Sequence, residues 1–222
     1  MRTHLLLDLD GTLSDSSPGI GRSLQHAFTE CGYDAPTDDQ VRSAIGPPFE
    51  ISFPRLGIPE HDIERVVASY RVRYERIGLF ENDLYPGIVE MLDTLAGDYT
   101  LAVATAKPEQ TAVRITEHFD LSRYFEVQAG ATIEVGSHRR TKGEVIGHAL
   151  EQLSLFAGDH VVMIGDRDHD VEGAHDHGID CIGVAWGFGS RKELEEAGAA
   201  AIVDDPADVA AAVASTYRAE AR

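Results

Sequence analysis

Two acidic residues follow the first apolar run of the chain and are separated by a single residue. The run covers residues 4–7, and Asp8, Leu9 and Asp10 come directly after it. Because successive side chains of a strand point to opposite faces, Asp8 and Asp10 share one side while Leu9 turns into the core. Two carboxylates held this close are costly unless a cation or a proton lies between them. The spacing indicates metal or acid–base chemistry, although Asp is also a common turn residue.

Complementary polar residues follow three later segments that have the pattern of buried strands. Thr105, Ala106 and Lys107 follow residues 99–104, Lys142 opens the helix after residues 125–129, and Asp166 to Asp170 follow residues 160–165. Ligands bind beyond the carboxyl ends of the strands in a parallel sheet. Taken singly, Thr105 is also consistent with a helix cap, Lys142 with a surface lysine and Asp166 with a turn acid. Taken together, they predict one site at one edge of one sheet.

The elements that position these residues alternate between strand and helix. We predict strands at 4–7, 99–104, 125–129, 160–165, 181–184 and 201–203, with helices at 88–95, 109–118, 142–153, 171–177, from 191 and after 206. This order predicts an α/β fold in which right-handed crossovers cover both faces of a parallel sheet. The core is then formed by residues 1–14 and 86–222.

Residues 15–85 have a different pattern, with helix after helix and no convincing strand. A first helix is expected to begin at Ser16 or Ser17, with Pro18 in its first turn, and to end at Gly32. Further helices are expected at 38–45, 50–56 and 60–77, where apolar residues recur at helical spacing. A helical block inserted after the first strand is best interpreted as a cap domain seated over the sheet.

The composition excludes several classes of function. A formal net charge of −19 argues against a nucleic-acid partner, because a phosphate backbone requires a basic surface. No apolar stretch is long enough for a membrane span or a signal peptide. The two cysteines, Cys31 and Cys181, do not form a disulfide framework or a zinc motif, which favours a cytoplasmic protein. The acidity serves either solubility or adaptation to high salt.

The polar motifs resemble, as a set, the four motifs of the haloacid dehalogenase-like (HAD) hydrolases. DLDGT at 8–12 resembles the first motif, Thr105 the second, Lys142 the third and GDRDHD at 165–170 the fourth. Within the family, the chain is similar to phosphoglycolate phosphatase-like and 5'-nucleotidase-like members, in the segments IGPPF (45–49), YPGI (85–88), TAKP (105–108) and GFGS (187–190). The resemblance implies a Rossmann-like core, a helical C1 cap and a Mg²⁺-dependent phosphatase.

The resemblance also implies a role for each site residue. Asp8 is expected to attack the phosphoryl group and form an aspartyl-phosphate, and Asp10 to act as general acid and base. Mg²⁺ would bind the carboxylates of Asp8 and Asp166 and the backbone carbonyl of Asp10. The expected phosphate-binding groups are the Thr105 hydroxyl, Lys142 and the backbone around Ala106. Asp170 would orient Lys142 or a metal-bound water, while His169, His175 and His177 are expected to be solvated surface rather than metal ligands.

The natural substrate is less defined by the sequence than the reaction. A small phosphorylated metabolite is expected, either a nucleoside 5'-monophosphate or phosphoglycolate. Phe49, which follows a stiff Gly-Pro-Pro turn, would suit a base, and Arg42 would suit a carboxylate. A phosphosugar mutase with the same motifs, a phosphoacceptor domain and a binding protein without turnover remain as alternatives, and the oligomeric state is open.

Overall fold

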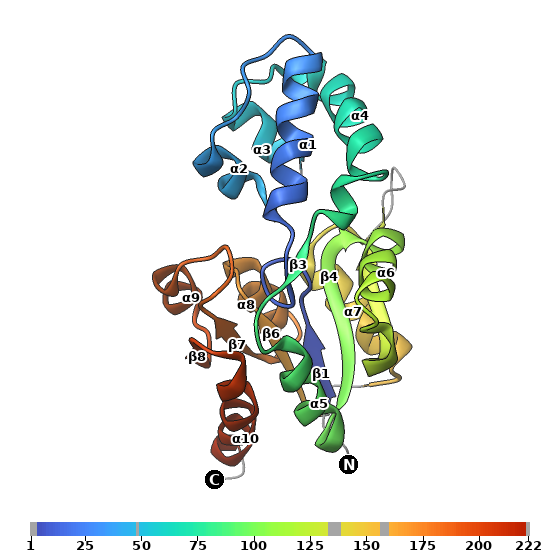
Figure 1. Ribbon diagram of the computed structural model, residues 1–222. Helices are drawn as coiled ribbons and strands as arrows, with labels where there is room; N and C mark the ends of the chain where they lie inside the picture. Colours follow the sequence, from blue (N-terminus) through green and yellow to red (C-terminus); the bar gives the residue numbers. More distant parts are fainter. Residues whose placement is uncertain (1–3, 48, 133–138, 156–159, 221–222) are drawn as a thin grey trace. The chain divides into compact units, whose positions relative to one another are not determined.

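The computed structural model describes residues 4–47, 49–132, 139–155 and 160–220, and it divides the chain into two units (Figure 1). The first unit comprises Met1–Ser14 and Leu84–Arg222, and the second comprises Asp15–Asp83. The chain passes between them twice, through the short strands β2 (Ser14–Asp15) and β3 (Asp83–Leu84), which pair with each other. Pro48, in the predicted stiff turn, lies outside the described residues.

Within the described residues, the first unit is built on a six-stranded sheet whose strand order is β5-β4-β1-β6-β7-β8. Every neighbouring pair is parallel, which confirms the predicted α/β fold. The strands are β1 (His4–Leu7), β4 (Thr100–Pro108), β5 (Phe125–Ala131), β6 (Val161–Gly165), β7 (Asp180–Val184) and β8 (Ala201–Val203). The register pairs Leu7 with Val103 on one side and with Ile164 on the other. The residues that follow β1 and β6 therefore emerge side by side at the carboxyl edge.

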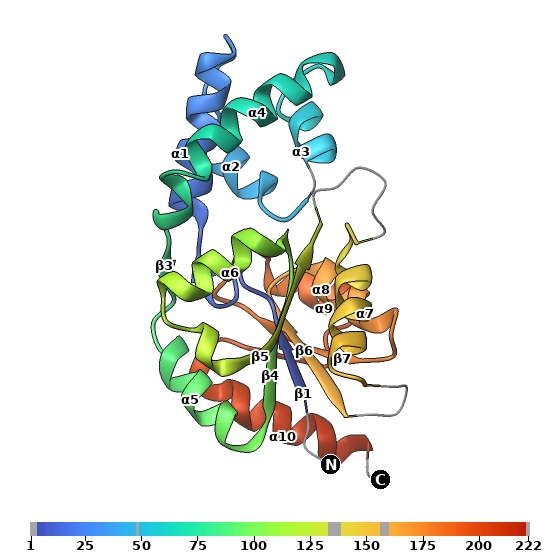
Figure 2. The same ribbon diagram turned by 90° about the vertical axis from the view of Figure 1, so that its right-hand side faces the viewer.

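Helices cover both faces of this sheet (Figure 2). One face carries α7 (Lys142–Gln152), α8 (Asp168–His175) and α9 (Arg191–Ala197), which pack against one another in that order. The other face carries α5 (Ile88–Asp98), α6 (Glu109–His118) and α10 (Val209–Glu220), with the short 3-10 helices η3 (Ser122–Tyr124) and η4 (Pro206–Asp208) beside them. None of the described helices is both long and apolar enough to cross a membrane.

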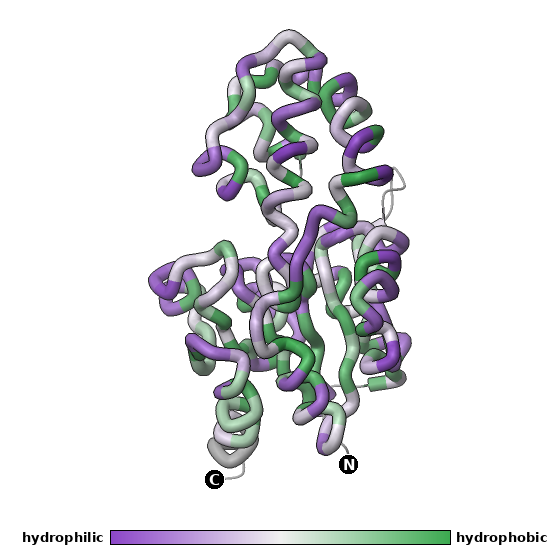
Figure 3. Tube along the Cα trace, in the orientation of Figure 1, coloured by the Kyte–Doolittle hydropathy of each residue, from purple (hydrophilic) through white to green (hydrophobic). Residues whose placement is uncertain are grey.

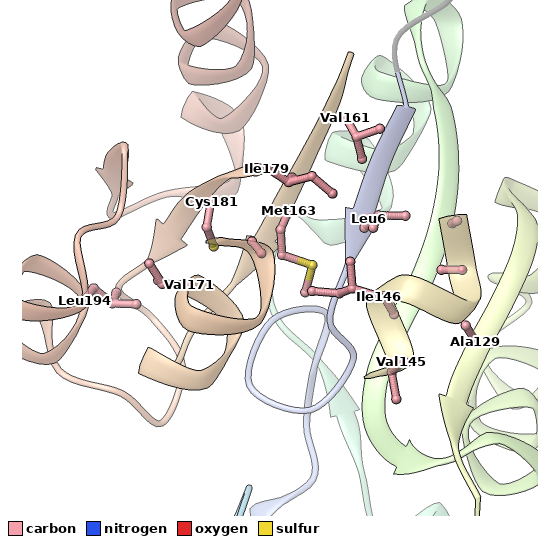
Figure 4. Close-up of a cluster of buried hydrophobic side chains, with 14 residues drawn as sticks. Leu6, Ala129, Val145, Ile146, Val161, Met163, Val171, Ile179, Cys181 and Leu194 are labelled. Atoms are coloured by element: carbon pink, nitrogen blue, oxygen red, sulfur yellow. The ribbon is translucent and has the colours of Figure 1, made fainter. Parts of the chain in front are cut away.

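A core cluster of the first unit lies between the sheet and α7, α8 and α9 (Figure 4). Leu6, Met163 and Cys181 contribute to it from adjacent strands. Ile146 contributes from α7 and Leu194 from α9. The central strands are apolar along their length, whereas the helices alternate between apolar and hydrophilic residues (Figure 3). A strand that is buried on both faces needs such a continuous apolar run. Replacing a buried residue such as Leu6 by Ala typically costs about 2–5 kcal/mol of stability.

The second unit consists of helices α1 (Ser17–Glu30), α2 (Asp38–Ala44), α3 (Phe49–Arg55) and α4 (Ile63–Tyr74), with the short 3-10 helices η1 (Glu60–Asp62) and η2 (Gly78–Phe80). Phe28 and Phe53 are buried and meet edge to face, with ring centroids 5.6 Å apart. Helix α1 packs against α4 and η2. The helical unit therefore has an aromatic core of its own.

Three helices differ from the sequence-based expectation in their cap, extent or start. The Ser16 side chain does not cap α1, because the Asp15 carboxylate accepts the Ser17 N–H instead, at 3.0 Å. The predicted helix at 60–77 is divided into η1 and α4, and α4 ends at Tyr74. Helix α8 begins at Asp168, earlier than expected, because the Asp170 carboxylate accepts the Arg167 N–H at 3.0 Å and closes the first turn.

Candidate active site

A buried lysine lies between two carboxylates at the carboxyl edge of the sheet. Lys142 Nζ is 2.9 Å from Asp8 Oδ1 and 2.7 Å from Asp170 Oδ1, and it donates a hydrogen bond to the Ala104 carbonyl at 3.0 Å. Lys142 is the first residue of α7, whose start is stabilised by a reciprocal pair of hydrogen bonds between Thr141 and Glu144. Asp8, which follows β1, therefore lies close to residues of α7 and α8, and the sequence analysis placed all three segments at this edge of the sheet.

The charges of this cluster stabilise one another. Burial alone lowers the pKa of Lys142, but Asp170 and Asp8 outweigh that effect and hold it above the ordinary value. Burial likewise raises the pKa of Asp170, but Lys142 reverses the direction, so that the net shift is downward. The pair therefore stays ionised. Removing one member of such a buried pair leaves an uncompensated charge, which costs far more than the pair contributes.

Asp166, at the end of β6, is held by groups from two other loops. The Thr12 hydroxyl donates to Asp166 Oδ1 at 3.1 Å, and the Phe188 N–H donates to Oδ2 at 2.8 Å. Gly11 passes close to this carboxylate with φ +84°, and a Cβ at that position would lie 2.2 Å from Oδ2. Only glycine combines this backbone conformation with so close an approach. The DLDGT turn therefore needs Gly11, because any side chain at this position would collide with the Asp166 carboxylate.

Among the described residues, no lysine contacts Asp166, so no nearby ammonium offsets the effects that raise the pKa of this carboxyl group. Burial, followed by the nearby carboxylates of Asp170 and Asp8, raises the pKa of Asp166 to about 7. Asp8, Asp166 and Asp170 are three buried acids that interact with one another, whereas Lys142 contacts Asp8 and Asp170 but not Asp166, so the cluster has an excess of negative charge. Carboxylate oxygens at such density are the ligands that Mg²⁺ prefers. The residues present fit a divalent cation.

His169 contradicts the sequence-based expectation of a solvated surface residue. Its side chain is only 28% exposed, and its ring lies close enough to Asp8 and Asp170 for the three to offer ligand atoms within 4.8 Å of one another. The early start of α8 explains the difference, because it places residue 169 in the first turn at the sheet edge. His175 and His177 are exposed, as expected. Imidazole nitrogen suits transition metals better than Mg²⁺.

The pKa of Asp166 predicts how stability depends on pH. A folded-state pKa of about 7, above the ordinary 3.8, means that the native state retains a proton that the unfolded state has released. The contribution of this group to stability is fully present below about pH 4 and is lost as the pH rises through about 7. We expect the Tm of Mg²⁺-free wild type to fall relative to that of Asp166→Asn between those pH values, as measured by thermal melts.

Added Mg²⁺ should reverse this loss. A ligand that binds only the native state stabilises it by about 2.7 kcal/mol at 100 times its Kd. At pH 8 we expect Mg²⁺ to raise the Tm of wild type clearly and that of Asp166→Asn little. A constant Tm difference between the two proteins across pH, or equal responses to Mg²⁺, would contradict a cation site at Asp166.

Asp10 is engaged by a second buried lysine, which the sequence analysis placed at this sheet edge without giving it a role. Lys107 Nζ lies 2.6 Å from Asp10 Oδ2, and Thr105 is buried beside them on β4. The Thr105 hydroxyl accepts the Lys107 N–H at 3.3 Å and does not cap α6, because β4 continues to Pro108. Ala106 lies half-buried between the two. The signal in the sequence was the scarcity of lysine, which occurs at only three positions.

The two predicted specificity residues belong to the helical unit. The Phe49 ring is half-buried and packs against Phe53 and Tyr70, at centroid distances of 4.7 Å and 5.0 Å. Arg42 is exposed in the last turn of α2. The described ring contacts of Phe49 therefore lie within its own unit.

Comparison with known proteins identifies the family. A sequence profile described as haloacid dehalogenase-like hydrolase matches residues 5–184. The chain belongs to this family. Among solved structures, a haloacid dehalogenase-like hydrolase, SP0104 from Streptococcus pneumoniae, is 32% identical with a TM-score of 0.89, over 95% of this chain and 97% of that one. These findings confirm the resemblance that the four motifs indicated.

The curated relatives carry more than one activity in their names. A 5'-nucleotidase from Pseudomonas aeruginosa is 42% identical over 193 residues, which are 86% of this chain and 86% of that protein. Tyrosine-protein kinase PtkA from Mycobacterium tuberculosis is also 42% identical over 193 residues, but these make up 65% of its length. The chain thus spans less than two thirds of that relative. Other relatives are named phosphoglycolate phosphatase.

Proposed function

We propose that this protein is a Mg²⁺-dependent phosphatase that hydrolyses small phosphomonoesters through an aspartyl-phosphate on Asp8. The observation that carries the proposal is the contact of buried Lys142 with both Asp8 and Asp170 at the carboxyl edge of the sheet. This arrangement places a nucleophilic carboxylate beside a fixed positive charge. Membership of the haloacid dehalogenase-like hydrolases and the phosphatase names of several relatives support it.

In the first half-reaction, a carboxylate oxygen of Asp8 forms a bond to phosphorus as the bond to the ester oxygen breaks. The described contacts of Asp8, to Lys142 and to the Leu9 N–H, both use Oδ1. Oδ2 is therefore the oxygen that attacks. Asp10 donates its proton to the departing ester oxygen, so that an alcohol leaves. Lys142, the Thr105 hydroxyl and the Ala106 N–H oppose the charge on the phosphoryl oxygens.

In the second half-reaction, water replaces the alcohol. Its oxygen forms a bond to phosphorus as the bond between phosphorus and the Asp8 oxygen breaks, and its proton passes to Asp10. Inorganic phosphate leaves, and both carboxylates return to their starting states. Asp10 must therefore present the same oxygen to two successive partners, first to a leaving group and then to water.

The acid cluster supplies the ligands for a metal ion. Asp8 and Asp166 would hold Mg²⁺ through their carboxylates and Asp10 through its backbone carbonyl, as the family resemblance implies. Bound Mg²⁺ would offset the repulsion between the anionic nucleophile and the anionic phosphoryl group. Asp170 acts indirectly, by holding the Lys142 ammonium that it contacts.

Release of inorganic phosphate from p-nitrophenyl phosphate, with and without a chelator, tests the reaction. We expect turnover that requires Mg²⁺ and that leaves all of the phosphate in solution. Phosphate retained on the organic product would indicate a mutase, and phosphate transferred to a tyrosine would indicate the activity in the name of the PtkA relative. Binding of phosphate without any turnover would indicate a binding protein.

For the substrate, we propose a nucleoside 5'-monophosphate, because the relative named 5'-nucleotidase covers most of both chains. A base is recognised by an aromatic or apolar surface, and Phe49 is a half-buried candidate in the helical unit. We expect nucleotides to exceed phosphoglycolate in kcat/KM across a substrate panel. Phe49→Ala should lower kcat/KM for nucleotides by roughly 10-fold and leave p-nitrophenyl phosphate unchanged.

Phe80→Ala, which removes a more exposed ring from the same helical unit, is the matched control. Arg42→Ala should matter only if the substrate carries a carboxylate. Equal losses on nucleotides and p-nitrophenyl phosphate would show that Phe49 only supports the fold of its unit. Phosphoglycolate as the preferred substrate, with loss in Arg42→Ala, would replace the nucleotide proposal.

A further inference from the structure

Lys107 is a buried cation that the mechanism above does not use. Its side chain is 5% exposed, and its Nζ lies 2.6 Å from Asp10 Oδ2. The chain contains only three lysines: Lys142 pairs with Asp8 and Asp170, and Lys192 is exposed on α9 and pairs with Glu196. Burying an ammonium is costly unless it is paired. Both buried lysines of this chain are therefore paired with acids of the candidate active site.

The backbone of Lys107 is fixed by the strand that carries it. Thr105 and Lys107 are two residues apart near the end of β4, where the pairing with β5 is irregular, and the Lys107 N–H donates a hydrogen bond to the Thr105 hydroxyl. The neighbouring strand β5 passes very close at Gly130, where a Cβ would lie 2.5 Å from Glu109 Cα and 2.7 Å from the Lys107 carbonyl. Lys107 thus reaches Asp10 from a strand end that is closely packed against β5.

The two oxygens of Asp10 differ in what they contact. Oδ2 is engaged by Lys107, whereas Oδ1 is buried and has no hydrogen-bond partner within the described part of the chain. A carboxylate with one oxygen anchored cannot rotate freely about its χ2 bond. Oδ1 is left as the oxygen that can exchange a proton with a ligand.

We propose that Lys107 is a positioning residue for Asp10, and this rests on the proposed phosphatase function. Its ion pair to Oδ2 fixes the rotation of the carboxylate, so that Oδ1 meets the leaving oxygen in the first half-reaction and the attacking water in the second. Lys107 itself gives up no proton and forms no bond to the substrate. Phosphate is held by Lys142 and Thr105, which are other residues, so the effect of Lys107 falls on kcat rather than on KM.

A double-mutant cycle on kcat tests this role. Asp10→Asn, Lys107→Met and the double variant are compared on an alkyl phosphate, whose poor leaving group needs a proton, and on p-nitrophenyl phosphate, whose good leaving group needs little help. General acid–base catalysis contributes ~10²–10⁴-fold, and we expect Lys107→Met to lose roughly 10²-fold on the alkyl ester and much less on p-nitrophenyl phosphate. Because Lys107 acts through Asp10, the double variant should be no slower than Asp10→Asn.

Thermal melts and two further variants separate positioning from folding. Asp10→Asn leaves Lys107 buried without its carboxylate and should lower the Tm, while the double variant should recover it. Lys192→Met removes an exposed lysine and is the matched control, with unchanged kcat and Tm. Lys107→Arg keeps the cation and should recover part of the alkyl phosphate activity. If Lys107→Met does not fold, Lys107→Gln and Lys107→Arg complete the same cycle.

The positioning role is overturned if the losses of Lys107→Met and Asp10→Asn multiply in the double variant, or if Lys107→Met loses equally on both esters. It is also overturned if KM rises while kcat is unchanged, since Lys107 would then bind substrate. These outcomes are distinct from failure of the proposed function, in which wild type releases no phosphate from either ester or Asp8→Asn retains full activity.

Discussion

Replacing Asp8 by Asn is expected to abolish phosphate release while leaving the protein folded. The amide has nearly the shape of the carboxylate, but it carries no negative charge and cannot form a stable acyl phosphate. Without the nucleophile, the enzyme cannot form the aspartyl-phosphate, and spontaneous hydrolysis of the ester is very slow. We therefore expect kcat to fall by more than ~10⁴-fold, to the detection limit. Steady-state phosphate release and a circular dichroism melt measure the two quantities.

A trapped intermediate provides the second measurement for Asp8. Brief incubation with substrate and rapid acid quenching should leave a phosphoryl group on the wild-type peptide that contains Asp8, and none on that peptide from Asp8→Asn. Asp204→Asn is the matched control, because Asp204 is an exposed acid paired with Arg191. Wild-type-like turnover by folded Asp8→Asn protein would falsify the nucleophile assignment.

Replacing Lys142 by Met is expected to remove activity and stability together. Lys142 is the cation that both Asp8 and Asp170 contact, and all three side chains are buried. Breaking a buried pair from one side typically costs about 3–5 kcal/mol, because the remaining charges have no counter-ion. We expect a Tm lowered by many degrees and phosphate release near the detection limit. Melts and initial rates at saturating Mg²⁺ measure these effects.

The effects of Lys142 on activity and on stability can be separated by replacing Asp170, one of its two acidic partners, in the same protein. Asp170→Asn added to Lys142→Met relieves the repulsion between the buried acids and should restore much of the Tm, but not the turnover. Lys192→Met again serves as the exposed-lysine control. Recovery of activity along with stability in the double variant would show that Lys142 contributes to the fold alone and does not oppose charge on the phosphoryl group.

The sequence alone determined the fold class and the sheet edge at which the candidate site lies. Strands that are buried on both faces leave continuous apolar runs, and their alternation with helices permits few topologies. The site acids follow those runs directly, and residues that end parallel strands meet at one edge whatever the details of packing. Asp8, Thr105, Lys142, Asp166 and Asp170 could therefore be predicted from local patterns that are a few residues long.

The tertiary structure decided which groups pair across that edge. Nothing in the residues around position 107 says that its ammonium meets a carboxylate 97 positions earlier in the chain, because that contact depends on the neighbouring placement of β1 and β4. The place of His169 depended in turn on one hydrogen bond that starts α8 at Asp168. Phe49 packs against Phe53 and Tyr70, two aromatic residues of its own unit, of which Tyr70 is distant from it along the sequence and becomes its neighbour only in the folded chain. Local pattern predicts where a side chain emerges, whereas its partner is chosen by distance and burial in the folded chain.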